Sequence, residues 1–116
     1  MSTIKVENIR IASEAVSRPV TGVAAAYWRS ATTFTLGASL NVSSMTDNST
    51  GDYDINFSNA FASSTDIVAT FGVASRDPEM YGGFPPSASQ IECRMFNSSG
   101  AVVDKNATGN VQGELA

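Results

Sequence analysis

The chain has 116 residues, of which 42% are hydrophobic and 16% are charged, and its net charge is −4 at pH 7. A chain of this length is expected to form one domain and to bury roughly two-thirds of the surface that it exposes when unfolded. Its seven Lys and Arg residues are scattered, which argues against nucleic acid as a partner because phosphate binding requires a basic patch. The longest apolar run, residues 23–28, is far shorter than the ~20 residues that cross a bilayer, so no membrane insertion is expected.

The sequence contains no histidine and a single cysteine, Cys93. The absence of histidine removes the commonest general base and the commonest zinc ligand, and it excludes Ser-His-Asp and Cys-His catalysis. A lone cysteine cannot form an internal disulfide. Asp77 and Glu79 are too few and too loop-bound to indicate the carboxylate pair of a glycosidase. We therefore expect a protein that is not an enzyme and that uses no cofactor and no metal.

Residues 1–21 are predicted to form an N-terminal arm and linker ahead of a single domain over residues 22–116. The arm begins as an alternating strand, and its alternation changes phase at Asn8. Such a break fits a bulge, or an extended arm that docks on a separate surface. Four apolar residues of the arm are the candidate assembly contacts: Ile4, Val6, Ile9 and Ile11.

Residues 23–30 are predicted to be a strand, because Pro19 and Gly22 precede them and clean alternation follows at Phe34 and Leu36. Trp28 lies in this segment. In a small β-domain a tryptophan is expected in the core more often than on a ligand platform.

Residues 40–61 are predicted to form one long β-hairpin. Tyr53, Ile55 and Phe57 share one face of its second arm, and Leu40, Val42 and Thr46 share a face of its first arm. Residues 47–52 have the composition of a turn, in which Gly51 supplies a positive φ. The carboxylates in this turn do not match the spacing of a calcium loop, so a turn is favoured over a Ca²⁺ site.

Residues 66–75 form the strongest strand pattern of the chain, with Ile67, Ala69, Phe71 and Val73 on one face. Gly72 is expected to mark a bulge or a close approach of the backbone.

Residues 76–90 lack periodicity and contain three prolines and two adjacent glycines, so they are predicted to be a long loop of functional importance. Exposed aromatic side chains on a loop suit contact with a carbohydrate or a protein. The alternative is that the rings fold back and cap the domain. The candidate contact residues of this loop are Met80, Tyr81, Phe84, Pro85 and Pro86.

Residues 91–96 alternate again, with Cys93 on the same face as Ile91 and Met95, which predicts a buried thiol. A second hairpin turn is expected at residues 97–100, followed by a returning strand from Ala101 and a weakly alternating tail. Six or seven short strands without an amphipathic helix predict an all-β fold, an antiparallel β-sandwich with an extended N-terminal arm.

Several segments occur in a characteristic order: MSTIKVENI at the start, the strand with Trp28, LNVSSMTDNSTGDYDINFSNAF, and a Ser-Ser-Gly turn followed by Asp104. In this order they resemble a small domain of tail-fibre and related structural proteins of tailed bacteriophages, which opens like STIKVD-I and has a centre like NVSSITDNGTGDYTVNF. The similarity is close over Asn41 to Phe57 and looser towards both termini.

This resemblance implies a virion component that is β-rich, usually multimeric and without catalytic residues. We therefore expect a short tail-fibre or adaptor-like subunit in the virion, which forms a homo-oligomer, a trimer, and binds other virion proteins. Two alternatives stay open. One alternative is a capsid decoration protein. The other is a tip module in which the 76–90 loop binds a host receptor or glycan.

Overall fold

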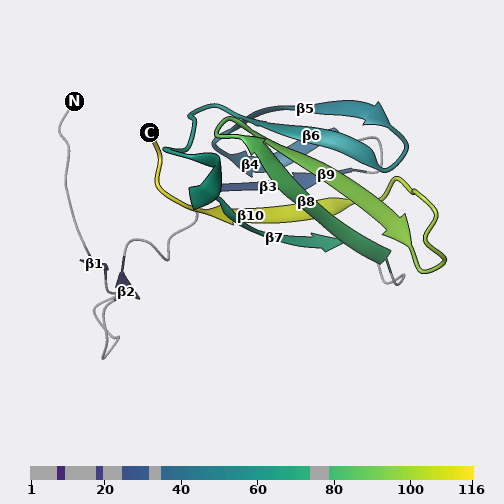
Figure 1. The fold of residues 1–116 in the computed structure, drawn as a ribbon. Coiled ribbons are helices and arrows are strands. Elements are labelled where there is room, and N and C mark those ends of the chain that lie inside the picture. Colours follow the sequence, from purple (N-terminus) through teal and green to yellow (C-terminus); the bar gives the residue numbers. More distant parts are fainter. Residues whose placement is uncertain (1–7, 10–17, 20–24, 32–34, 74–78) are drawn as a thin grey trace.

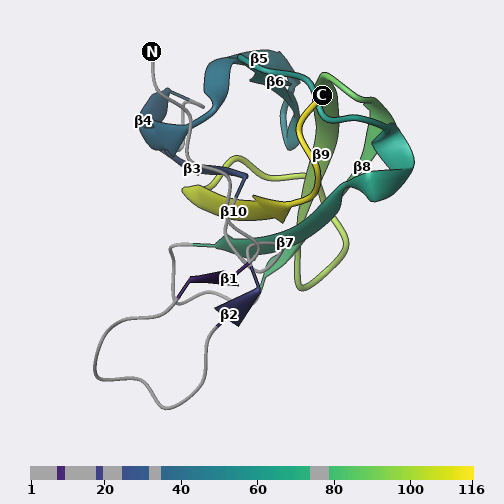
Figure 2. The ribbon, with the colours of Figure 1, turned by 90° about the vertical axis from the view of Figure 1, so that its left-hand side faces the viewer.

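In the computed structural model, which describes residues 8–9, 18–19, 25–31, 35–73 and 79–116, the chain folds into an antiparallel β-sandwich (Figure 1). The first sheet has the order β4-β3-β10-β7, and the second sheet has the order β5-β6-β9-β8. Seen from one end, β10 and β7 form one layer and β5 and β6 lie across from them (Figure 2). The predicted all-β sandwich is confirmed.

The strands of the first sheet are β4 (Leu36–Leu40), β3 (Ala26–Ser30), β10 (Ala107–Gln112) and β7 (Val68–Val73). Those of the second sheet are β5 (Val42–Ser49), β6 (Asp52–Phe57), β9 (Gln90–Asn97) and β8 (Glu79–Ser87). One short 3₁₀ helix, η2 (Ser64–Asp66), precedes β7. The described residues thus place eight strands in the two sheets, where the sequence predicted six or seven.

A separate two-stranded pair forms from β1 (Asn8–Ile9) and β2 (Arg18–Pro19). Figure 1 shows this pair beyond one end of the sandwich, so it belongs to neither sheet. Part of the predicted linker, Arg18–Pro19, is therefore paired with the arm. The boundary between arm and domain at residues 21 and 22 stays a prediction, because it lies outside the described residues.

Alternation along the strands builds the core between the sheets. Side chains of β3, β6 and β9 are buried at every second position, as expected for strands with one face turned to a core. The predicted burial of Trp28 and Cys93 is confirmed. The buried core consists of Ala26, Trp28, Tyr53, Ile55, Phe57, Phe61, Ile91, Cys93, Met95, Ala107 and Val111.

The first arm of the predicted hairpin is divided between the two sheets. Leu40 ends β4 in the first sheet and Val42 begins β5 in the second, so the prediction that they share a face is wrong. The chain crosses at Asn41, which has a positive φ of 56°. The Asn41 side chain holds this corner, since its Nδ2 donates to Asn59 O over 3.1 Å and its Oδ1 accepts from Asn59 N over 2.7 Å. Asparagine is one of the few residue types that adopts this geometry readily.

The second arm and the hairpin turn agree better with the prediction. β5 and β6 pair antiparallel, and Tyr53, Ile55 and Phe57 face the core. The turn is shorter than expected, because β5 continues through Ser49, and Gly51 has the predicted positive φ, 68°.

Gly51 also ties the hairpin to the rest of the sandwich. Its N–H donates to Asp104 Oδ1 over 2.6 Å, and its carbonyl accepts from Met95 N over 2.9 Å. Val102 forms an isolated bridge to Phe96, and the chain then leaves for the first sheet as β10. The returning strand predicted from Ala101 is thus reduced to that one bridge.

The prediction of a loop over residues 76–90 is wrong for most of this segment. Glu79–Ser87 form β8, which pairs with β9 from Glu79 to Phe84 and again at Ser87. The prediction failed because prolines are tolerated on an edge strand, where no neighbour needs their missing N–H. Pro85 and Pro86 lie where the register with β9 breaks. Residues 74–78 lie outside the described part of the chain.

The two sheets meet on the side chain of Trp28. Its indole packs over Gly109 of the neighbouring strand β10, and a Cβ at Gly109 would overlap the ring. The Phe71 ring meets the indole edge-on, with centroids 6.1 Å apart. Gly109 is therefore required by the size of the side chain beside it rather than by its backbone conformation.

Replacing Gly109 with alanine is expected to lower the free energy of unfolding by at least about 2 kcal/mol, because the methyl group forces the indole out of its position. Urea denaturation followed by Trp28 fluorescence measures this loss. The matched control is Gly82→Ala, where a Cβ meets nothing within 4 Å, and we expect a change below about 1 kcal/mol. Equal losses in both variants would contradict the packing argument.

Candidate functional site

Among the carboxylates of the β5–β6 hairpin, Asp52 is engaged in contacts within the second sheet. Asp52 accepts from Asn48 Nδ2 over 3.4 Å and forms an ion pair of 3.1 Å with Arg94. Arg94 also pairs with Glu92 over 3.2 Å, and Glu92 lies directly opposite Asp54. Among the described residues, no three His, Cys, Asp or Glu side chains are grouped closely enough to hold a metal ion. The arginine thus balances a run of like charges across the sheet.

Two buried titratable groups face each other in the core. Tyr53 and Cys93 are cross-strand partners on β6 and β9, and both are fully buried. Burial raises the pKa of the Tyr53 phenol far above its ordinary value, and the neighbouring Trp28 indole offsets part of that shift. Burial likewise raises the pKa of the Cys93 thiol, and the hydrogen bond from Tyr53 opposes the shift. Both groups are therefore neutral in the folded protein, which leaves the thiol without the thiolate character that reactive cysteines need.

The raised pKa of Cys93 predicts a loss of stability in alkaline solution. The thiol of the unfolded chain ionises near pH ~8.5 whereas the folded thiol stays neutral, so the unfolded state gains stability as the pH rises. Between pH ~8.5 and ~10 we expect the free energy of unfolding to fall by up to about 1.4 kcal/mol per pH unit. Urea denaturation at several pH values measures the slope. Cys93→Ala is the control, and an unchanged slope in that variant would contradict the assignment.

The structure describes only part of the predicted assembly arm. Ile9 lies in β1, where it pairs with Arg18. Ile4, Val6 and Ile11 lie outside the described residues. Their role as assembly contacts stays a prediction.

The predicted contact residues lie on the edge strand β8 rather than on a loop. Phe84 is 54% exposed and stands opposite Glu92 of β9, so its ring does not cap the core. Pro85 is half-buried and Pro86 is exposed. For Met80 and Tyr81 the structure describes the backbone position on β8. The binding role of this set stays a prediction.

Phe84→Ala separates a contact role from a packing role. Because the ring is half exposed, we expect the substitution to change the free energy of unfolding by less than about 1 kcal/mol. A contact role on β8 predicts impaired assembly or host attachment at an unchanged melting temperature. Phe61→Ala, which removes a buried ring, is the control and should lower the melting temperature strongly. A comparable loss for Phe84→Ala would show that the ring packs rather than binds.

The outer face of the first sheet is a surface that the sequence patterns did not single out. Tyr27 is 41% exposed at its centre, beside the exposed Leu40 of β4 and opposite Asn110 of β10. A groove of about 400 Å³ runs along this face. It is lined by Tyr27, Trp28, Thr70, Phe71, Gly72, Thr108, Gly109 and Asn110. The register across β3, β10 and β7, which brings these residues together, is not visible in a single strand pattern.

Charge is divided unequally between the two sheets. The four strands of the first sheet contain one charged residue, Arg29. The strands of the second sheet carry five carboxylates, Asp47, Asp52, Asp54, Glu79 and Glu92, against one arginine, Arg94. Of these carboxylates, Asp52, Asp54 and Glu92 lie on the outer face of the second sheet, so the two outer faces suit different partners.

Comparison of the chain with models of protein families, with curated proteins and with solved structures finds no match. Within the described residues, no helix is long and apolar enough to span a membrane.

Proposed function

We propose that the protein is a structural subunit of a bacteriophage virion, a short tail-fibre or adaptor-like component that acts by homo-oligomeric assembly and surface contact. The observation that supports the assembly part of the proposal is the pair β1–β2, which holds part of the arm outside both sheets of the sandwich. An element of this kind is available to a neighbouring chain. The resemblance of residues 41–57 to tail-fibre domains supports the same function, and these residues fold as β5, β6 and their turn.

In this proposal the arm supplies the assembly contacts and the sandwich supplies a rigid body. Ile4 and Val6 are spaced to bury on one face of an added strand, and the backbone of that strand pairs with the edge of a partner sheet. When the arm of each protomer docks on the next protomer, the subunits close into a ring, and we propose that this ring has three subunits. The mechanism is adhesion, and no bond is made or broken.

Light scattering after size-exclusion chromatography tests the assembly. We expect the full chain to be a trimer and the double variant Ile4→Ser, Val6→Ser to be a monomer, because the variant loses the apolar face of the arm. Lys5→Ser is the matched control on the opposite face of the arm and should remain trimeric. A full chain that is monomeric at all concentrations would overturn the assembly mechanism.

Location within the particle tests the virion role separately. Labelling of the subunit in intact virions is expected to place it on the tail. A label spread over the capsid would instead support a decoration protein, the main alternative. Absence of the subunit from purified particles would contradict both.

A further inference from the structure

We propose that the outer face of the first sheet binds an acidic saccharide, which stacks on Tyr27 and pairs its carboxylate with Arg29. This inference goes beyond the assembly role, because it concerns a different face of the sandwich from the arm. It rests on the groove, the side chains that line it and the distribution of charge between the sheets.

Strand register aligns the outward side chains of this face in two rows. Asn110 of β10 lies opposite Tyr27 on one side and opposite Thr70 on the other. In the next row Thr108 lies opposite Arg29 and opposite Gly72. Tyr27 and Arg29 are two residues apart on β3, so they project from the same face.

The groove is open because Gly72 contributes no side chain. A Cβ at Gly72 would meet Thr108 Oγ1 at 2.9 Å, and that hydroxyl donates to Gly72 O over 3.3 Å. The close approach predicted for this glycine is therefore to the Thr108 side chain, and β7 keeps a regular register with β10 there. The result is a shallow, open depression of about 400 Å³ between Tyr27, Asn110 and Thr70.

A second hollow lies next to Arg29 on the same sheet. It has a volume of about 290 Å³ and lies between β3, β4 and the start of β10, where Arg29, Gly37 and Asn106 contribute to its lining. Arg29 lines this second hollow, and its cross-strand partner Thr108 lines the first groove, so the residue adjoins both. A chain of sugar units has the extended shape that fills both.

The chemistry of the lining selects a saccharide. The C–H face of a sugar ring packs on a half-exposed aromatic ring, and its hydroxyl groups bond to amides and hydroxyls such as those of Asn110 and Thr70. Tyr27 and its cross-strand neighbour Leu40, which is 46% exposed, form the apolar part of this face. Val68 of β7, 65% exposed, is separated from them by the polar β10 positions. The apolar surface is therefore small, and a single sugar ring fits it better than a protein, which needs a larger contiguous apolar patch.

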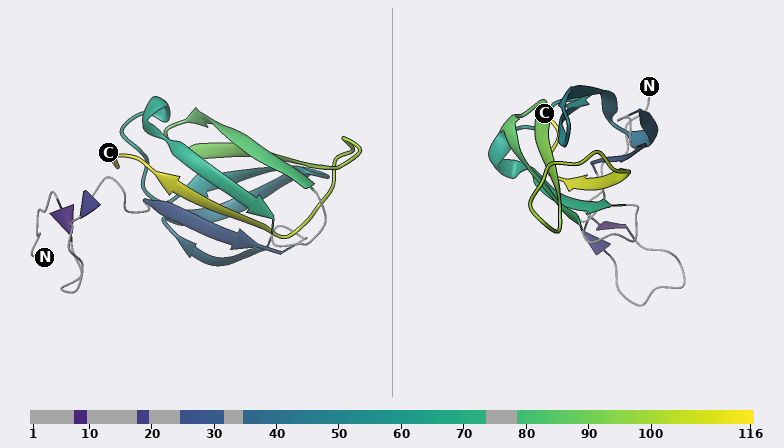
Figure 3. Two further views of the ribbon diagram at one scale, coloured as in Figure 1. Left: turned by 90° about the horizontal axis from the view of Figure 1, so that it is seen from below. Right: turned by 90° about the vertical axis from the view of Figure 1, so that its right-hand side faces the viewer.

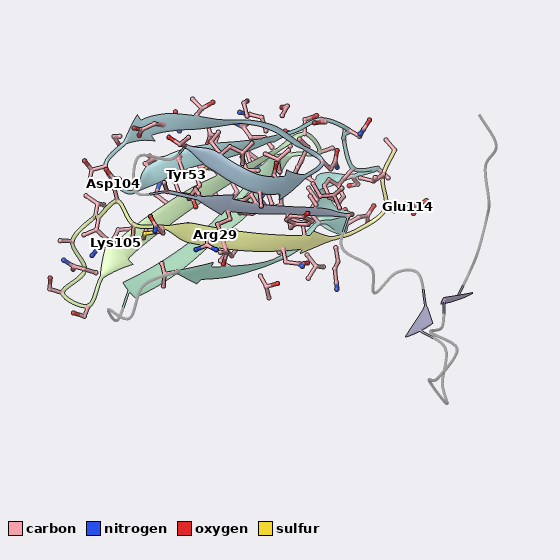
Figure 4. The ribbon with its side chains drawn as sticks, turned by 180° about the vertical axis from the view of Figure 1, so that it is seen from behind. Arg29, Tyr53, Asp104, Lys105 and Glu114 are labelled. Carbon is pink, nitrogen blue, oxygen red and sulfur yellow. The ribbon has the colours of Figure 1, made fainter. Side chains whose placement is uncertain are left out.

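The charge on this face selects an acidic saccharide. Arg29 has no carboxylate partner among the described residues and is the only charged residue of the four strands as the structure describes them. Figure 4 shows Arg29 along β3, with Asp104 and Glu114 towards opposite ends of the sandwich. A guanidinium binds a carboxylate through two parallel hydrogen bonds. The view from below in Figure 3 shows β4, β3, β10 and β7 with no described element lying over them.

Titration with oligogalacturonate tests the proposal in the full chain, with isothermal calorimetry as the readout. We expect saturable binding that weakens at least about tenfold in Tyr27→Ala and in Arg29→Gln and is retained in Tyr27→Phe. The methyl ester of the same oligosaccharide keeps the stacking face and lacks the charge, so it should bind the unaltered chain about as weakly as the acid binds Arg29→Gln.

The control variants lie on the second sheet. Arg94→Gln removes the arginine of the second four-stranded sheet, and Phe84→Ala removes the exposed ring of β8; both variants should bind with unchanged affinity. Thermal melts of each variant exclude unfolding as the cause of lost binding. The absence of any binding, or binding that is equally strong for the ester or insensitive to Tyr27→Ala and Arg29→Gln, would overturn the proposal. None of these outcomes depends on the oligomeric state, so the proposed assembly role stands or fails separately.

Discussion

The fit of the Trp28 indole over Gly109 is the constraint on which the rest of the sandwich depends. A tryptophan is too large to share the inner face of adjacent strands with another side chain, so its neighbour on β10 must be a glycine. The indole then reaches Phe71 on the far side of β10 and the Tyr53 phenol on the opposite sheet. One residue therefore connects three strands of the first sheet to the centre of the second. It also sets the floor of the groove on the outer face, which Gly109 and the Trp28 residue line from below.

Two polar contacts hold the chain where it leaves one sheet for the other. Asn41 turns the chain from β4 into β5 and bonds to the backbone of Asn59. Asp104 accepts from the Gly51 N–H just before β10 joins the first sheet. A backbone N–H that is partly buried needs a partner, and a carboxylate is a stronger acceptor than water or a carbonyl.

The sequence predicted what alternation and turn chemistry determine locally. Tyr53, Ile55 and Phe57 alternate without interruption, and Gly51 has the backbone freedom that the turn requires, so the hairpin was predictable. The division of the first arm of the hairpin at Asn41 was not predictable, because a single left-handed residue redirects the chain without disturbing the alternation around it. The strand β8 was missed for the opposite reason. Its prolines are typical of a loop, and only the pairing with β9, which is non-local, makes it an edge strand.

The candidate sites differ in predictability for the same physical reason. The candidate contact set on β8 was visible in the sequence because its two aromatic residues and its prolines are close together in the chain. The groove on the first sheet joins residues of β3, β7 and β10 that are far apart in sequence, and only the strand register reveals them.

The division of charge between the sheets gives each face of the sandwich a distinct use. Asp52, Asp54 and Glu92 share the outer face of the second sheet with one arginine, Arg94, so two copies that approached through this face would repel each other. In the proposed oligomer the contacts therefore come from the arm, and the acidic faces turn away from one another towards water. That arrangement leaves the first sheet, with its single arginine, free to meet an anionic ligand. Assembly and ligand binding then use different surfaces, and a change in one of them leaves the other intact.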